Sequence, residues 1–248
     1  FRRVLFRSET IIAQIRELGD YCFCSFFRME NITMGNAVEW GNGVVKECCS
    51  LKFLGMPEGK EMLPSYFCDG CVQLEHISVP HTVTRLWDYV FDKCTALQEV
   101  TLPDDVTDIG RHVFENCSCM TEMILSSMLK RIGGQVFQEC RILEKVVIPD
   151  GIDEIVDSMF SGCYTLTEIV IPKSVTTVSR YSFENCQCMK RYYFLPDSPP
   201  ELTTTGTFLG LPKDCKFYVP KGRLDVYQTA ENWSNYASYM VEMEGDVL

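Results

Sequence analysis

The sequence of 248 residues has little histidine and few basic residues, and it contains no long apolar run. Only three histidines are present, and 23 Lys and Arg residues stand against 34 Asp and Glu residues, giving a net charge of −11. General binding to nucleic acids or anionic membranes needs clustered basic residues, so the acidic balance argues against both classes. A membrane-spanning helix needs about 18 consecutive apolar residues, and no such run occurs. P-loop and dinucleotide-binding fingerprints are also missing.

Apolar residues and cysteine are plentiful instead. The sequence is 46% hydrophobic and 12% aromatic, enough for a sizeable core rather than a disordered chain. Fourteen cysteines are compatible with a disulfide scaffold or a metal protein, and their spacing has to decide. The first eight residues include neither an initiator Met nor the features of a signal peptide. We interpret them as an expression remnant or as the continuation of a longer chain.

A repeat of 23 residues runs through most of the sequence. A phenylalanine opens each central unit, at Phe91, Phe114, Phe137, Phe160 and Phe183. A cysteine follows three residues later, at Cys94, Cys117, Cys140, Cys163 and Cys186. Leu or Met comes three residues after that, then two alternating apolar positions and, in most units, proline. The register continues upstream through Cys71 and Cys48, and a looser unit begins at Phe23.

Each unit predicts one coil of a solenoid. The alternating segment around Val100 and Leu102 is typical of a short strand that Pro103 ends. Val106 and Ile109 indicate a second short extended segment, and the stretch before Phe114 a helical or 3-10 turn. One unit cannot bury its apolar face alone, but stacked units form a continuous core. About nine coils spaced about 4.8 Å apart would span roughly 40 Å.

The pattern F-x-x-C-x-x-L-x-x-[VI]-x-[LI]-P-x-x-V-x-x-I resembles the BspA-like leucine-rich-repeat surface proteins over residues 20–220. The resemblance implies a β-rich solenoid of the α/β class, with short parallel strands in a right-handed superhelix and terminal caps. The segment 31–42 departs from the family period. We predict an N-terminal helix or cap at 1–22, repeats at 23–196, and a degenerate last repeat with a C-terminal cap at 197–248.

Amphipathic segments are expected to close both ends of the core. Leu224, Tyr227 and Trp233 predict a helix that covers the last coil. At the other end, the helical spacing of Ile11, Ile12, Ile15 and Leu18 predicts a cap for the first coil.

Half of the cysteines occupy one slot of the repeat. These seven, which we call the cysteine ladder, are Cys48, Cys71, Cys94, Cys117, Cys140, Cys163 and Cys186. The favoured interpretation is a small, slightly polar side chain buried in a tight turn. Disulfides between neighbouring coils are the main alternative, but parallel Cβ vectors disfavour the required dihedral angle. Cys68 and Cys71 look like a zinc or redox pair, yet no second pair completes four ligands.

Catalytic constellations are weak. His112 lies five residues before Cys117, but a buried ladder cysteine and an outward histidine do not make a nucleophile and base. Gly110, Gly133 and Gly134 fall at the turns of their repeats and do not form a phosphate-binding motif. We therefore expect no enzyme activity, no cofactor and no metal.

Outward positions of the predicted strands form two rows. The first row is His76, Glu99, Glu122, Lys145, Glu168 and Arg191, and the second is Ser78, Thr101, Ile124, Val147, Val170 and Tyr193. The apolar half of the second row is either ordinary strand composition or a contact patch. We predict a partner-binding face made of Glu99, Glu122, Ile124, Lys145, Val147, Glu168, Val170, Arg191 and Tyr193.

The expected function is that of a non-enzymatic leucine-rich-repeat binding protein. The resemblance implies a secreted or surface-displayed module that recognises a protein or glycan, with neither nucleic-acid binding nor membrane insertion; self-association of the chain is a further option. Two alternatives stay open: a structural spacer or stalk in a larger surface protein, and an intracellular interaction scaffold.

Overall fold

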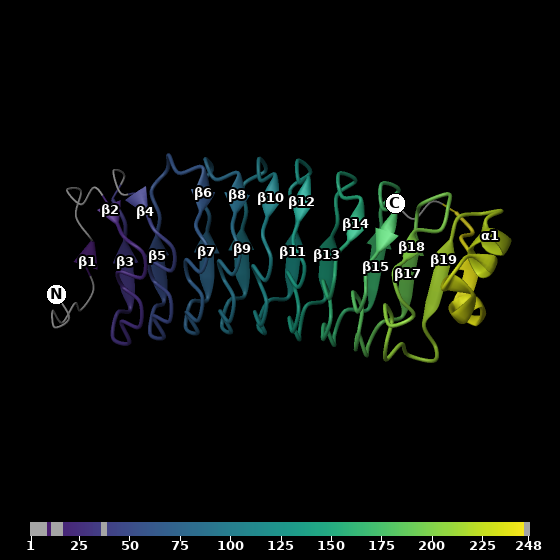
Figure 1. The fold of residues 1–248 in the computed structure, drawn as a ribbon. Helices are drawn as coiled ribbons and strands as arrows, with labels where there is room; N and C mark the ends of the chain where they lie inside the picture. The colour runs from purple at the N-terminus through teal and green to yellow at the C-terminus, as the bar shows by residue number, and fades with distance from the viewer. Residues whose placement is uncertain (1–8, 11–16, 36–38, 246–248) are drawn as a thin grey trace.

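The protein is a solenoid of about ten turns built on parallel strands, which confirms the predicted fold class. The computed structural model describes residues 9–10, 17–35 and 39–245. Figure 1 shows narrow coils following one another along a single axis, with helix α1 at the C-terminal end. Each coil has a longer strand, a shorter strand and a turn side.

One set of strands, most of three or four residues, forms the strand face. Its members are β1 (Glu9–Thr10), β3 (Asn31–Thr33), β5 (Phe53–Gly55), β7 (His76–Ser78), β9 (Glu99–Thr101), β11 (Glu122–Ile124), β13 (Lys145–Val147), β15 (Glu168–Ile171), β17 (Arg191–Phe194), β19 (Lys216–Val219) and β20 (Met240–Glu242). The pairing is parallel and keeps the 23-residue register in the central coils, as in His76 opposite Glu99. Proline or a turn ends these strands, which keeps them short.

The shorter strands form a second face. They are β2 (Glu17–Leu18), β4 (Glu39–Trp40), β6 (Met62–Leu63), β8 (Arg85–Leu86), β10 (Asp108–Ile109), β12 (Arg131–Ile132), β14 (Glu154–Ile155), β16 (Thr177–Val178) and β18 (Glu201–Leu202). In each repeat the second residue turns inward, and Leu86 and Ile109 are almost fully buried. The first residue points to solvent, so each pair places one side chain on each side.

The turn side differs from the helical or 3-10 turn of the sequence interpretation. In the described repeats this side consists of hydrogen-bonded turns, with residues two before and two after the Phe in the left-handed region; Tyr89 has φ 60° and Lys93 φ 56°. The Phe91 N–H donates to the carbonyl of Val113 in the next coil at 2.9 Å. Because alternate N–H groups bond to the next coil, they cannot build a continuous helix within their own.

The core contains a ladder of stacked phenylalanine rings. Phe114 and Phe137 stack at 5.7 Å between centroids, and Phe137 and Phe160 do so at the same distance. All three side chains are fully buried. Parallel offset stacking of identical residues follows from the constant repeat length and links each coil to its neighbours.

The cysteine ladder lies beside these rings. Each ladder thiol donates to the carbonyl of the Phe-slot residue in the preceding coil, as Cys117 does to Phe91 at 3.2 Å and Cys140 to Phe114 at 3.1 Å. The buried thiol thus fills the turn and donates to a carbonyl of the neighbouring coil. An alanine at this slot could not make that hydrogen bond. All fourteen cysteines lie within the described residues, and all are free thiols.

Burial should make the ladder thiols unreactive in the folded protein. It raises the pKa of Cys117 and Cys163 well above the ordinary value, and the thiolate is the reactive form. We expect a thiol reagent to modify exposed Cys188 quickly in native protein and to reach all fourteen cysteines only after denaturation. A titration that finds fewer than fourteen thiols in denatured, unreduced protein would contradict the free-thiol state.

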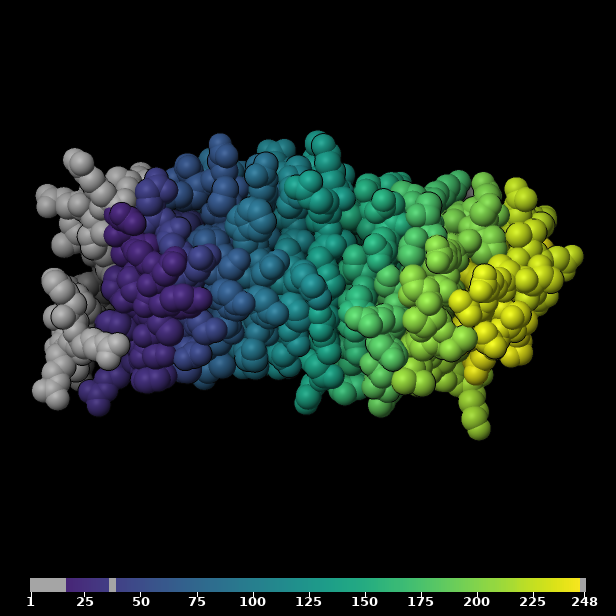
Figure 2. Space-filling view, in the orientation of Figure 1, coloured from purple at the N-terminus to yellow at the C-terminus, as the bar shows by residue number. Residues whose placement is uncertain are grey.

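The C-terminal segment covers the end of the core. Helix α1 (Leu224–Thr229) buries Tyr227, and the 3-10 helix η1 (Trp233–Tyr239) buries Trp233. The Trp233 Nε1–H donates to the carbonyl of Pro200 at 2.6 Å, and the Tyr227 hydroxyl donates to the carbonyl of Pro196 at 2.8 Å. Figure 2 shows the C-terminal segment, in yellow, against the last coils.

The N-terminal end departs from the sequence interpretation at one position. Leu18, expected in a capping helix, is buried in strand β2 and pairs with Trp40. The other residues of that predicted helix, Ile11, Ile12 and Ile15, lie outside the described residues. The apolar spacing suggested a helix through Leu18, but Leu18 is instead paired as a strand residue of the second face.

Candidate functional site

The predicted apolar stripe consists of Ile124, Val147, Val170 and Tyr193, and the structure aligns all four on the strand face. Ile124 lies opposite Val147, and Val170 lies opposite Tyr193, in successive parallel pairs. The relative exposure is 65% for Ile124 and 44% for Val147, whereas Val170 and Tyr193 are half-buried. The stripe is therefore most exposed at β11 and β13.

The charged first row runs beside the stripe. Its six members, His76, Glu99, Glu122, Lys145, Glu168 and Arg191, are all exposed, as predicted for outward strand positions. The Arg191 guanidinium donates to the Glu168 carboxylate from Nε at 3.0 Å and from Nη2 at 2.6 Å. His76 and Glu99 approach to 3.5 Å. These exposed contacts orient the side chains and contribute little to stability.

The structure adds two residues to these rows. Lys216 lies opposite Arg191, and Tyr218 lies opposite Tyr193, with the two tyrosine rings stacked at 4.9 Å. Sequence reasoning stopped at Tyr193 because the unit around Phe217 is degenerate. The signal was available: Phe217 and Val219 alternate as core positions, so Lys216 and Tyr218 had to face outward.

The residues considered for catalysis are kept apart. Cys117 is buried and bonded to the Phe91 carbonyl, while His112 Nδ1 lies 2.5 Å from a Glu115 carboxylate oxygen. The His112 ring also stacks on Tyr89 at 4.4 Å. Within the described ranges, no three His, Cys, Asp or Glu side chains gather as a metal site would require. His112 is thus a largely covered ring that stacks on Tyr89 and pairs with Glu115, not a base directed at a thiol.

Buried or half-buried carboxylates, Asp69, Asp92 and Glu115, lie on the turn side. Asp92 is 1% exposed, its Oδ2 accepts from the Lys93 ammonium at 2.5 Å, and its Oδ1 has no partner. Burial raises the pKa of the Asp92 carboxyl group, and nearby Glu115 and Asp69 act in the same direction while Lys93 opposes them. Burial and the neighbouring carboxylates thus disfavour the charged form of Asp92, and the group lies inside the turn side rather than in a substrate pocket.

None of the helices in the described part of the chain has the length and apolar character needed to cross a bilayer. The repeated coils, the parallel strand face and the capped core define a leucine-rich-repeat solenoid. The family model described as the BspA type leucine rich repeat region matches residues 1–67 and 61–190 in six copies. The chain therefore belongs to the BspA-type leucine-rich-repeat family, and leucine-rich-repeat proteins of this kind are generally non-enzymatic.

One solved structure supports the fold, and others were found at lower similarity. The leucine-rich repeat protein of T. pallidum, TpLRR, superposes with a TM-score of 0.54 at 21% identity, covering 73% of this chain and 76% of that chain. A leucine-rich repeat protein from Bacteroides ovatus has a TM-score of 0.49 at 17% sequence identity, covering 95% of this chain and 83% of that chain. A leucine rich cell surface protein from Faecalibacterium prausnitzii has a TM-score of 0.41 at 16% sequence identity, covering 91% of this chain and 80% of that chain. Comparison with curated protein sequences found no match.

Proposed function

We propose that the protein is a non-enzymatic binding module that holds a protein partner against its strand face. The observation that carries the proposal is the apolar stripe, which is built from adjacent coils in one register and starts with the highly exposed Ile124 and Val147. A contiguous exposed apolar patch often marks an interface, because water release on contact is favourable.

The surroundings of the stripe fit a protein contact. Charged side chains of the first row border it on one side, and the paired tyrosines Tyr193 and Tyr218 extend it toward the C-terminus. Apolar centres with a polar rim and aromatic anchors are common at protein interfaces. Because the chain carries a net charge of −11, the partner surface should be basic around its apolar centre.

The test is a double substitution on the stripe. Val147→Glu with Val170→Glu puts two charges at the contact without touching the core, so we expect binding to weaken by about 100-fold or more. The matched control is Thr101→Glu, because Thr101 is an exposed member of the same row just outside the stripe. Candidate partners are extracellular matrix proteins. They are screened against this protein immobilised on a surface, and their affinities are measured by surface plasmon resonance.

Self-association is measured on the same variants by light scattering. Loss of partner binding in the double variant, with unchanged circular dichroism and full binding by the control, supports the proposal. Equal binding by the double variant and the control would remove the stripe as the contact surface.

We further propose that the interaction takes place outside the cell, as the likeness to BspA-type surface proteins implies. The free ladder thiols are compatible with this location because their burial protects them from exchange. Protease treatment of intact cells that express the natural full-length gene should remove the protein; complete protection in intact cells, with digestion after lysis, would place it inside.

A further inference from the structure

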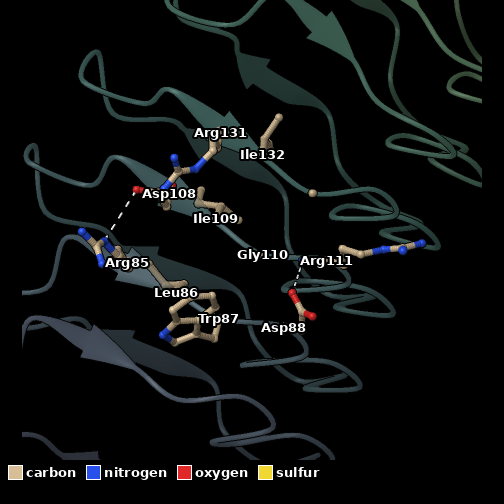
Figure 3. A pocket seen from close by; sticks show the side chains of 11 residues that line it. Arg85, Leu86, Trp87, Asp88, Asp108, Ile109, Gly110, Arg111, Arg131 and Ile132 are labelled. Carbon is tan, nitrogen blue, oxygen red and sulfur yellow. Dashed lines mark hydrogen bonds and ion pairs between the residues drawn. The ribbon is translucent and has the colours of Figure 1, made fainter.

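A pocket on the second face is independent of the strand face and of the function proposed above. It spans β8, β10 and β12 and has a volume of about 240 Å³. Figure 3 shows side chains from three consecutive coils around it. The lining residues come from three matching stretches, 85–88, 108–111 and 131–133, with Trp87 in the first of these coils and Gly110 and Gly133 at the equivalent position of the next two.

Two of the lining positions are glycines because successive coils approach too closely there for a side chain. A Cβ on Gly110 would lie 2.6 Å from the carbonyl carbon of Trp87, and a Cβ on Gly133 would lie 2.6 Å from that of Gly110. Both distances are too short for any other residue. At the equivalent position of the preceding coil stands Trp87, so one indole is followed by two glycines along this row of the second face.

Trp87 supplies an aromatic wall. Its side chain is 46% exposed, and its Nε1 lies 3.2 Å from the sulfur of Met62. The N–H contact with the sulfur holds one edge of the indole, while much of the ring stays open to solvent. An exposed indole held in this way offers a rigid apolar surface to the flat side of another ring.

Charged groups along the pocket favour an anion. Asp108 pairs with Arg131 and lies 3.8 Å from Arg85, so a single carboxylate stands between two guanidinium groups. Each guanidinium carries about five N–H donors, and Asp108 engages only part of them. The two arginine side chains remain well exposed. Arg111 and Asp88 also line the pocket, so three arginines stand against two aspartates, a locally positive spot on an acidic chain. The planar forks of arginine match carboxylates in particular.

We propose that this pocket binds a sugar ring that carries a carboxylate, a uronic acid unit. The apolar C–H face of the ring packs on Trp87, and its carboxylate takes the free donors of Arg85 and Arg131. A cavity of about 240 Å³ lies below the usual range for drug-sized ligands, about 300 Å³ and above, and suits one ring.

The experiment uses sodium glucuronate as the probe, with glucose as the neutral sugar and acetate as the non-sugar anion. Binding is followed by ligand-observed NMR. It is also followed by the protection of tryptophan fluorescence from quenching by acrylamide, because Trp87 is the most exposed of the three tryptophans. We expect glucuronate to bind at least about 10-fold more tightly than either comparison compound, as one added charged hydrogen bond or one ring contact predicts.

Two variants and one control assign the site. Trp87→Ala and Arg131→Gln should each weaken glucuronate binding about 10-fold or more. Arg141→Gln is the control, because Arg141 is likewise exposed and ion-paired but its partner Glu139 lies on the turn side. Equal binding of acetate or glucose, the same loss in the control, or no binding of glucuronate at about 50 mM, which lies in the range of weak affinities, would overturn the proposal.

A uronate tetrasaccharide distinguishes the two sources of such a ring. Tighter binding of the tetrasaccharide, lost in the Trp87 and Arg131 variants, assigns the pocket to a unit within a polysaccharide. Equal affinity per ring assigns it to the free acid. Since the strand-face variants leave this pocket untouched, they should bind glucuronate normally, and failure of one proposal does not affect the other.

Discussion

Phe137→Ala should destabilise the protein by about 3–5 kcal/mol, as expected when a fully buried aromatic ring is removed from a packed core. Phe137 is completely buried and stacks with Phe114 on one side and with Phe160 on the other. Its neighbours cannot collapse into the gap, because each coil is held by its own strand pairing and by turn hydrogen bonds to the next coil. The midpoint of urea unfolding measures the effect.

The control for this substitution is Phe27→Ala, since Phe27 is 62% exposed and sits outside the core. That change should alter stability by about 0.5 kcal/mol or less. Similar unfolding midpoints for the two variants would show that the stacked rings are not a principal source of stability.

The position of Phe137 near the middle of the array gives a second readout. In a solenoid each coil contacts only its neighbours, so a weak central interface separates two stable halves. Hydrogen exchange in Phe137→Ala should therefore accelerate around Phe114 and Phe160 first, while the distant coils keep their protection. Uniform acceleration along the chain would indicate that the array unfolds as one unit.

The period of 23 residues predicted the positions of the central strands because every coil repeats the same inward pattern. Ile169 and Ile171 alternate inward around outward Val170, as a strand requires, and the structure places them so. The buried slots of Phe137 and Cys140 followed from the same repeat. These features depend on side-chain periodicity, which the sequence displays directly.

The turn side was less accessible to sequence reasoning. Left-handed residues at Asn116 and Gly162 carry a compositional signal, but Lys93 and Glu139 adopt the same conformation without one. Their backbone angles are imposed by hydrogen bonds to the next coil, which is a tertiary effect. A helical turn was the reasonable prediction from local composition, and the stacking of coils overrode it.

The pocket at Trp87 could not be predicted for a related reason. Gly110 and Gly133 looked like turn glycines, yet neither has a positive φ, and each directly follows a strand of the second face. Their requirement is the close approach of consecutive coils. The distance between two backbones 23 residues apart is not encoded in either residue alone, so the hollow appears only once the coils are stacked.

Trp233→Ala should open the C-terminal end of the core. The Trp233 ring meets Phe194 edge to face at 4.8 Å and Tyr227 at 5.2 Å, and its Nε1–H bonds to the carbonyl of Pro200. Loss of the buried ring should cost about 3–5 kcal/mol locally, with the Pro200 carbonyl left as a buried acceptor without this donor. In Phe137→Ala the weakened coil has intact coils on both sides, whereas in Trp233→Ala it has intact coils on only one side.

The expected result is fraying from the C-terminus rather than separation into halves. Hydrogen exchange should accelerate in β17 and β19, whereas β7 and β9 should keep their wild-type protection, because nearest-neighbour coupling confines the loss. Val226→Ala is the matched control, since Val226 belongs to the same cap but is 46% exposed. Wild-type protection in β17 and β19 of Trp233→Ala would mean that the coils are stable without the cap, whereas loss in β7 and β9 as well would mean that the cap stabilises the whole array.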